Sequence, residues 1–331
     1  MDDELVLEER GNLVHIRLNR PGSLNALSTG MLKGLGDVLN IAGERTILVH
    51  GEGRAFCAGG DIKMQTQAIR DNDKAGPTAY FRNEYGFNAK LFHHEGIYVS
   101  YLNGIVMGGG YGVSAHGSHL VTSEATAFAM PEVKIGFFPD VGAVYHLARV
   151  PSEMGTYMAL TGNTVNAADM LYMGLADGHI PLAQFGVFKE ALETRAAADV
   201  IASMSARPEA EGILRKHEDV IASCFAHDDA QAIVDALKIQ GSVFAITTAQ
   251  EIEARSPTSV AVALAHIRAA KNDVFDTVID RDLRLSQRFL DVPDFPEGVR
   301  AAIIDKDRKP RWNPRSLAEF PASEAALYLK S

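Results

Sequence analysis

The residues best suited to chemistry lie in one segment of the chain, from Asn103 to Gly142. Three consecutive glycines, Gly108–Gly110, stand where the surrounding pattern predicts a turn from a strand into a helix. Two acidic residues, Glu132 and Asp140, follow eight positions apart in an apolar loop. Apolar surroundings raise the pKa of a carboxyl group and make it a better base. The two carboxyl groups are therefore candidates for acid and base work.

An upstream segment, Gly53–Lys63 (GRAFCAGGDIK), has the same character: a short strand, a turn of small residues and a helix that begins with an acid. Two such turns can direct two backbone N–H groups at one point, which stabilises an oxygen that becomes anionic. A helix N-terminus nearby would add partial positive charge. The two segments together predict oxyanion chemistry on a carbonyl group.

The elements that must position these turns alternate between strand and helix in the first half of the chain. A strand pair is expected at Leu5–Glu9 and Leu13–Asn19, and further strands at Thr46–His50, Ile97–Leu102 and His119–Thr122. Helices are expected at Ser28–Asn40, with Ser28 as cap, and at Thr78–Phe92. This alternation implies a largely parallel sheet covered by helices.

The second half reads almost entirely as helix. Expected helices are Ser152–Leu160, Ala167–Met173, Phe188–Met204, Glu209–Ser223, Ala230–Gln240, Thr248–Arg255, Pro257–Lys271, Asp276–Leu290 and Glu297–Ile304. We therefore expect residues 1–180 to form an α/β core with the active site, and residues 181–331 to form a helical region that packs on it or extends it.

Bulk composition excludes some classes of protein. The chain has 331 residues and a net charge of -10, and this acidic balance argues against non-specific nucleic-acid binding. Only Cys57 and Cys224 are present, far apart, so neither a disulfide framework nor a zinc site is indicated. Cys57 could be a nucleophile, but no base stands beside it in the sequence, and a small buried residue in a tight turn is the favoured interpretation.

The ends and the apolar runs bear on location. The first residues are acidic and lead directly into a strand, with no signal peptide or transit segment visible. No apolar run reaches the length of a transmembrane helix. We therefore expect a cytoplasmic protein with no membrane partner.

Two motifs carry a resemblance to a known family. FCAGGDIK and NGIVMGGGYG resemble the oxyanion-hole signatures of the crotonase (enoyl-CoA hydratase/isomerase) superfamily. GGGYG followed by FAMPEVKIGFFPDVG is similar to its 3-hydroxyisobutyryl-CoA hydrolase branch, as are FRNEYGFN, SPTSVAVA and FPEGVRAAIIDKDRKPRWNP. The resemblance runs from about Leu13 to Pro314. It implies a stacked, repeated ββα core of two sheets followed by a helical C-terminal region.

The resemblance also implies roles for individual residues. The N–H groups of Ala58 and Gly109 would form the oxyanion hole. Glu132 would attack the thioester carbonyl or activate water, and Asp140 would orient that group and relay a proton. From the residues alone, Asp140 could equally cap a helix that starts near Val141. The resemblance favours the catalytic role.

Two further residues are expected at the substrate. By resemblance, Glu84 would accept a hydrogen bond from the 3-hydroxyl group, although a lone helix carboxylate is more often solvated. Lys63 could approach the phosphates of coenzyme A, or it could be a surface lysine. Coenzyme A would enter as part of an acyl-CoA substrate, with no separate cofactor and no metal. A homo-oligomer is possible.

Two departures from the family pattern favour a hydrolase. A typical hydratase carries a Glu three residues beyond the middle glycine, where this chain has Gly112, and Asp140 stands where many hydratases have a glycine. The resemblance therefore implies a 3-hydroxyisobutyryl-CoA hydrolase of valine breakdown. The alternatives are an enoyl-CoA hydratase or isomerase of the same fold, and a non-catalytic acyl-CoA-binding protein.

Overall fold

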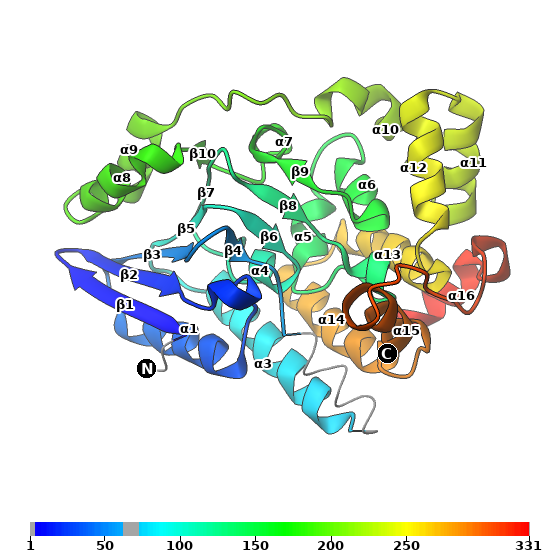
Figure 1. The fold of residues 1–331 in the computed structure, drawn as a ribbon, viewed down its shortest axis with the longest axis horizontal. Helices are drawn as coiled ribbons and strands as arrows, with labels where there is room; N and C mark the ends of the chain where they lie inside the picture. The colour runs from blue at the N-terminus through cyan, green and yellow to red at the C-terminus, as the bar shows by residue number, and fades with distance from the viewer. Residues whose placement is uncertain (1–3, 62–72, 331) are drawn as a thin grey trace. The chain divides into compact units, whose positions relative to one another are not determined.

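The computed structural model describes residues 4–61 and 73–330 (Figure 1). By compactness the chain forms two units that interleave along the sequence. Unit 1 comprises Met1–Asp61, Asn83–Ala129 and Thr164–Arg215, and unit 2 comprises Ile62–Arg82, Met130–Asn163 and Lys216–Ser331. The sequence predicts a boundary at residue 180 because the secondary structure changes there from mixed to helical. As a domain boundary it stays a prediction.

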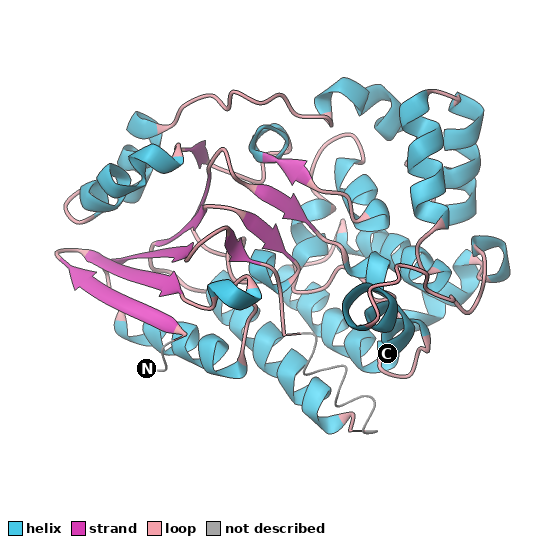
Figure 2. Cartoon of the chain, in the orientation of Figure 1, coloured by secondary structure: helices cyan, strands magenta, loops and turns pink. Residues whose placement is uncertain are grey.

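Unit 1 contains a six-stranded sheet in the order β1-β2-β3-β5-β7-β10 (Figures 1 and 2). Its strands are β1 Leu5–Arg10, β2 Leu13–Leu18, β3 Thr46–Gly51, β5 Tyr98–Leu102, β7 His119–Thr122 and β10 Gly178–His179. Only the β1–β2 pair is antiparallel. The expected strand pair, the buried strands and the largely parallel sheet are thus confirmed.

The core on this sheet follows from apolar runs on β3 and β5. Leu48 and Val99 lie on these paired strands and are fully buried against Phe188 and Leu192. These partners belong to α8 Phe185–Leu192, and α9 Ala197–Met204 covers the same core. A strand that is apolar at almost every position can be stable only when both of its faces are covered.

A second sheet in unit 1 has the order β4-β6-β8-β9. Its strands are β4 Ala55–Cys57, β6 Ile105–Met107, β8 Ala127–Ala129 and β9 Val165–Asn166. β4, β6 and β8 are parallel, and β9 is antiparallel to β8. These strands are two or three residues long, which is too short for an alternating pattern to reveal, and only the family resemblance implied a second sheet.

A serine and an asparagine side chain cap two of the helices of unit 1. Helix α1 Thr29–Ile41 starts after Ser28, whose side chain accepts the Met31 N–H at 3.1 Å as expected. Helix α7 Ala167–Tyr172 starts with a capping box. The short helix α4 Gly109–Gly112 follows β6 directly. Helix α3 Ala75–Phe92 has residues in both units.

Unit 2 is built of helices. Its elements are η2 Glu132–Ile135, α5 Ala143–Leu147, α6 Met154–Thr161, α10 Glu218–Cys224, α11 Ala230–Gln240, α12 Val243–Glu253, α13 Pro257–Ala270, α14 Phe275–Phe289, α15 Asp294–Val299, the π-helical turn η5 Arg300–Ile304, η6 Leu317–Glu319 and α16 Ala322–Tyr328. In the part of the chain that the structure describes, every element after β10 is a helix (Figure 2). The expected helical second half is confirmed.

Three expected helices are wrong in extent, and the one expected at Thr248–Arg255 begins earlier, at Val243 of α12. The other two are interrupted or shortened. The helix expected at Phe188–Met204 is two helices, α8 and α9, and the carbonyl of Glu193 between them accepts the Asn12 N–H at 2.9 Å. The helix expected at Glu209–Ser223 is confined to α10 and the turn before it. Gly212 in the irregular part packs directly against Asp169, and the Asp169 carboxylate accepts the Leu214 N–H at 2.9 Å. Tertiary contacts override helical propensity at both places.

Candidate active site

The two glycine-rich turns lie side by side in unit 1 because the strands that lead into them are neighbours. Ala55 pairs with Ile105 and Cys57 with Val106, in parallel register. The carboxyl ends of parallel strands meet at the same sheet edge, so the chain leaves β4 and β6 toward the same place. The sequence prediction that the two turns converge is thus explained by the short second sheet.

Space, rather than backbone conformation, requires glycine at Gly109 and Gly110. A Cβ atom on Gly109 would collide with Oε1 of Glu84 and would lie 3.2 Å from the backbone nitrogen of Gly60. A Cβ atom on Gly110 would collide with the carbonyl of Cys57. Glycine therefore lets α4 approach β4 and lets a carboxylate approach the turn.

In the first glycine-rich turn, one backbone N–H group is engaged in a hydrogen bond and another is not. The Ala58 N–H donates to the carbonyl of Leu24 at 3.0 Å, so the expectation that it forms the oxyanion hole conflicts with its geometry. Gly59, at φ +108°, reverses the chain direction, and the next N–H, that of Gly60, donates to none of the described residues. The Gly109 N–H likewise donates to none of them. Gly60 was not singled out from the sequence, although the pair Gly59–Gly60 was a visible signal.

Glu84 lies beside the glycine turn. It is on α3, only 3% exposed, with Oε1 against Gly109. It is thus not the solvated helix carboxylate of the alternative interpretation. Lys63, the expected phosphate contact, lies outside the described residues.

Cys57 is a structural residue of the β4 end. Burial raises the pKa of its thiol to about 12, and the nearby charge of Glu84 adds to this, although the Gly59 N–H donates to the sulfur. A nucleophilic cysteine needs a lowered pKa, because the thiolate is the reactive form. The buried structural interpretation is therefore favoured over a nucleophile.

In unit 2, Glu132 opens the 3-10 turn η2. It is 7% exposed, and its carbonyl accepts the Phe137 N–H at 3.0 Å. Gly136, at φ +73°, ends the turn and packs tightly on the backbone of Asp294. Burial lowers the pKa of the neighbouring Lys134, while the negative charge of Glu132 acts in the opposite sense. Glu132 thus belongs to a short, tightly packed turn. The positive charge of Lys134 partly compensates the negative charge of its carboxylate.

Asp140 lies at the end of an aromatic segment that fixes its backbone. Phe137 stacks on Phe81 at a ring distance of 5.5 Å, and Phe138 packs on Phe289 at 5.1 Å. Asp140 is 6% exposed. The N-cap of α5 is Gly142, with no side-chain cap hydrogen bond, so the capping interpretation of Asp140 is wrong.

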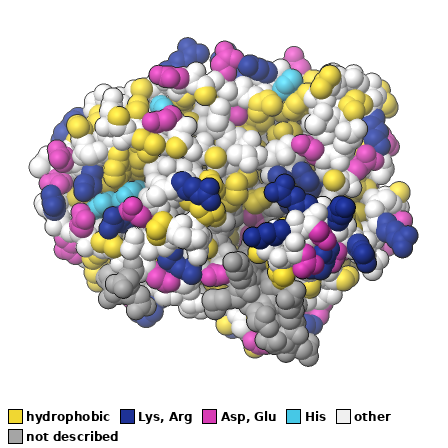
Figure 3. Space-filling view, in the orientation of Figure 1, with side chains coloured by type: hydrophobic (Ala, Val, Ile, Leu, Met, Phe, Trp, Pro, Cys, Tyr) yellow, Lys and Arg dark blue, Asp and Glu magenta, His cyan; other side chains and the backbone are white. Residues whose placement is uncertain are grey.

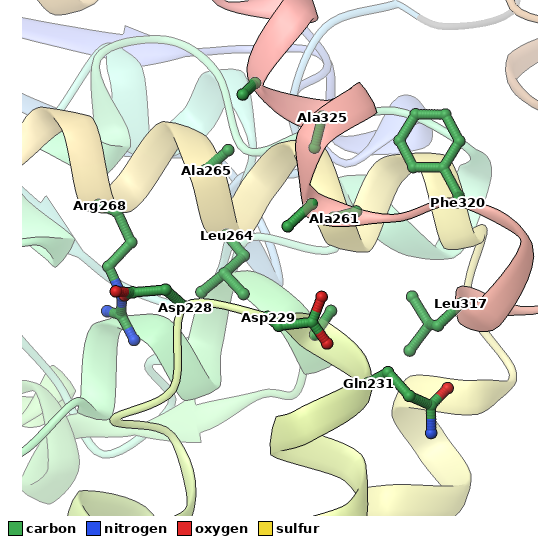
Figure 4. A pocket seen from close by; sticks show the side chains of 13 residues that line it. Asp228, Asp229, Gln231, Ala261, Leu264, Ala265, Arg268, Leu317, Phe320 and Ala325 are labelled. Atoms are coloured by element: carbon green, nitrogen blue, oxygen red, sulfur yellow. The ribbon is translucent and has the colours of Figure 1, made fainter.

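A pocket of about 400 Å³ in unit 2 contains none of these residues (Figure 4). It is lined by alanines and Leu264 of α13, by α16 and by Asp228 and Asp229. Its one cation, Arg268, already donates to Asp228 and Glu153.

The described residues also bear on metal ions, membranes and nucleic acids. Within 4–61 and 73–330, no three His, Cys, Asp or Glu side chains are grouped so that they could hold a metal ion. None of the helices described is long and apolar enough to cross a membrane. On the face drawn in Figure 3, several Lys and Arg side chains gather to the right of the centre, with Asp and Glu side chains among and around them.

Curated relatives match almost the whole chain. A 3-hydroxyisobutyryl-CoA hydrolase, mitochondrial, from Bos taurus is 36% identical over 343 residues, covering 99% of this chain and 89% of the relative. The protein of the same name from Homo sapiens is 35% identical with the same coverage. A 3-hydroxyisobutyryl-CoA hydrolase-like protein 1, mitochondrial, from Arabidopsis thaliana is 36% identical over 96% of this chain and 84% of its own.

Solved structures confirm the expected crotonase-like fold. A carnitinyl-CoA dehydratase from Mycobacterium thermoresistibile has a TM-score of 0.92 at 32% identity, covering 100% of this chain and 97% of that one. An enoyl-CoA hydratase from Rhodobacter sphaeroides has a TM-score of 0.90 at 30% identity, with coverages of 98% and 97%. The family model Enoyl-CoA hydratase/isomerase matches residues 13–329. The chain belongs to the enoyl-CoA hydratase/isomerase family.

Proposed function

We propose that this chain is an acyl-CoA thioester hydrolase whose substrate is 3-hydroxyisobutyryl-CoA. The observation that best supports a hydrolase is the combination of a buried Gly112, where a hydratase would carry its Glu, with two buried carboxyl groups, Glu132 and Asp140. The names of the curated relatives support the same reaction and substrate.

The carbonyl oxygen of the thioester would be held by backbone donors of unit 1. Gly109 and Gly60 fit this role, because their N–H groups donate to none of the described residues and the Gly60 nitrogen is 3.2 Å from the Cβ position of Gly109. Ala58 does not fit, because its N–H is engaged by Leu24. Such donors act where negative charge develops, and losing one costs about 2.7–4 kcal/mol of transition-state stabilisation.

The carboxylates of unit 2 would carry out the cleavage. An oxygen of Glu132 attacks the carbonyl carbon, the C–S bond breaks, and the thiolate of coenzyme A leaves and takes up a proton. Water then hydrolyses the mixed anhydride to 3-hydroxyisobutyrate and restores Glu132. In the alternative route Glu132 removes a proton from water, which attacks the carbonyl directly. In both routes Asp140 orients the attacking group and relays a proton.

Glu84 would bind the 3-hydroxyl group of the acyl chain. Its carboxylate is buried beside the proposed carbonyl site, which places a hydrogen-bond acceptor close to the acyl end of the substrate. A site built to accept a hydrogen bond discriminates strongly against a substrate without the hydroxyl group, because the buried acceptor is then left unpaired. Acyl-CoA thioesters without a 3-hydroxyl group are therefore expected to be poor substrates.

The test is release of thiol from 3-hydroxyisobutyryl-CoA, followed with a thiol-reactive dye. The raised pKa and complete burial of Cys57 keep that thiol from contributing to the signal. Wild type should release thiol rapidly, and Glu132→Gln and Asp140→Asn should both lose most of the rate. Unchanged rates in both variants would remove the two carboxylates from the mechanism.

Solvent labelled with oxygen-18 separates the two routes. In a single turnover with enzyme in excess, the anhydride route places one label in the carboxyl group of Glu132 when water attacks the Glu132 carbon of the mixed anhydride. Direct attack by water places the label in the product alone. Mass spectrometry of the peptide that carries Glu132 reads the difference.

Hydration of an enoyl-CoA is the second candidate, because the two solved structures with TM-scores of 0.92 and 0.90 are a dehydratase and a hydratase. Loss of the crotonyl-CoA absorbance, with no thiol release from 3-hydroxyisobutyryl-CoA, would establish it. Tight binding of acyl-CoA without any turnover, unchanged in Glu132→Ala, would instead indicate a non-catalytic binding protein.

Location in the cell stays part of the proposal. The sequence predicts a cytoplasmic protein, whereas the curated relatives are named as mitochondrial. Fractionation of the native cells followed by immunodetection of this chain decides between the two. The possible homo-oligomer is tested by light scattering on the purified protein.

A further inference from the structure

A buried polar network in unit 2 reaches the turn that follows Asp140. Asp282 on α14 is completely buried, and its Oδ2 accepts the Gly142 N–H at 2.7 Å. Its other oxygen, Oδ1, lies 2.6 Å from Nε2 of His266 on α13, which is also completely buried. A side chain 140 residues away in sequence thus holds the backbone two residues after Asp140.

The neighbours of His266 indicate which of its two ring nitrogens donates a hydrogen bond. Arg281, which also pairs with Asp273, lies with a guanidinium nitrogen 3.4 Å from Nδ1 of His266. Because a guanidinium can only donate, Nδ1 must accept, and Nε2 then carries the proton that is donated to Asp282. The carboxylate of Asp282 therefore accepts two hydrogen bonds, one from His266 and one from the Gly142 backbone.

The turn held by Asp282 has an unusual backbone. Val141 is at φ +55° and Gly142 at φ +72°, so two successive residues are left-handed. Valine is β-branched, and this conformation is a genuine outlier for it, which persists only where the surroundings enforce it. Val141 is 1% exposed, and Asp140 precedes it directly. The left-handed residue Val141 is therefore adjacent to Asp140, whose carboxyl group takes part in the proposed reaction.

We propose that Asp282 and His266 are positioning residues for Asp140, which rests on the proposed function. By accepting the Gly142 N–H, Asp282 locks the left-handed turn and so fixes the backbone from which the Asp140 carboxyl group acts. His266 keeps the Asp282 carboxylate in place by donating to its second oxygen. Neither residue touches the substrate in this scheme.

The test substitutes Asp282 by Asn, which keeps the shape but presents an NH₂ group to one of the two donors. A displacement near 1 Å at a catalytic group can cost about 10²-fold in rate. We therefore expect kcat for thiol release to fall by about 10–100-fold, with KM changed by less than about twofold. His266→Gln, which retains a donor, should show a smaller fall in kcat.

Asp169→Asn is the matched control. Asp169 is 1% exposed and accepts a backbone N–H from a residue far away in sequence, Leu214, at 2.9 Å, but it lies in unit 1. If a loss of stability alone lowers the activity, the fall in each variant should follow the decrease in its melting temperature. Thermal unfolding measured by circular dichroism on both proteins separates that loss from a change in kcat.

A double-mutant cycle asks whether Asp282 acts through Asp140. If it does, Asp282→Asn should add nothing to Asp140→Asn, because the group it positions is already inactive. Multiplied effects in the double variant, or a wild-type kcat in Asp282→Asn, would overturn the proposal.

Hydrogen exchange of the backbone amides at residues 141–143 supplies a readout that does not depend on activity. Exchange there should be faster in Asp282→Asn than in wild type and unchanged in Asp169→Asn. Unchanged exchange in Asp282→Asn would refute the anchor. If wild type releases no thiol at all, the proposed function fails, while the exchange experiment still decides whether Asp282 holds the turn.

Discussion

The two units support their parts of the candidate site with similar turns held in different ways. In unit 1, Leu24 and Asn25 are successive left-handed residues at φ +52° and +57°, and Leu24 accepts the Ala58 N–H. In unit 2, Val141 and Gly142 are successive left-handed residues next to Asp140. Each turn lies next to a candidate site residue or to the glycine-rich turn that contains one. Each is held by a fully buried polar side chain.

The supports differ in charge and in sequence distance. Asn25 holds its own turn: its amide donates to the carbonyls of Glu52 and Ala55 at 3.0 and 2.8 Å and accepts the Arg20 N–H at 2.9 Å. The turn after Asp140 is held from another helix by Asp282, which His266 supports. Asn25 belongs to the turn that it supports, although its two acceptors are 27 and 30 residues away, whereas Asp282 is 140 residues from the Gly142 N–H that it accepts. In both cases a buried polar side chain is paired with partners that tertiary packing brings to it.

The largest effect should come from the carboxylate of unit 2. Glu132→Gln should lower kcat by about 10²–10⁴-fold, because it removes the base or nucleophile. Glu84→Gln in unit 1 should instead raise KM by about 10-fold or more, because it weakens a hydrogen bond to a charged group. Steady-state thiol release measures both constants. A fall in kcat of equal size in both variants would break the distinction between reacting and binding carboxylates.

The next effect concerns the backbone donors of unit 1. Replacing the peptide N–H of Gly60 by an ester oxygen, through incorporation of glycolic acid, should lower kcat by about 10²–10³-fold. The matched ester at Ala58, from lactic acid, removes the bond to Leu24 and should cost about 1 kcal/mol of stability with little change in kcat. The opposite outcome would restore Ala58 as the oxyanion donor.

Asn25→Ala should destabilise the fold by about 3 kcal/mol, because two buried carbonyls lose a donor and alanine tolerates the left-handed region poorly. Asn40→Ala, at an exposed position on α1, should be close to neutral. Urea unfolding followed by fluorescence measures both. If the two variants lose the same small amount, the local support of the unit 1 turn is less important than its hydrogen bonds suggest.

The smallest effect is a pH dependence in unit 1. Burial, together with the charge of His15, lowers the pKa of His50 to about 3. The unfolded chain takes up a proton near pH 6.5 but the folded chain does not, so stability should be complete above about pH 6.5 and fall as pH drops toward 3. His50→Leu should flatten this slope, while His227→Leu, at an exposed position of unit 2, should leave it unchanged. Urea unfolding from pH 7 to pH 4.5 gives the slopes.

The fold was predictable wherever local pattern and burial agree. Strand β3 is a short apolar run, and α1 begins at a serine cap, so both were expected close to their observed bounds. The strands of the second sheet were hidden, since three residues such as Ala55–Cys57 show no period. The break between α8 and α9 was hidden as well, because it depends on a hydrogen bond from the distant Asn12.

By itself the sequence determined the two glycine turns, Glu84, Glu132 and Asp140, because each stands in a short motif whose residue types limit what the backbone can do. Only the tertiary structure decided which N–H groups of those turns are engaged, as Ala58 and Gly60 show. The tertiary structure alone revealed that Asp282 accepts the Gly142 N–H after Asp140 and that His266 contacts Asp282. Hydrogen bonds between residues far apart in the chain leave no local pattern, so the supports of a site become visible only once the chain is folded.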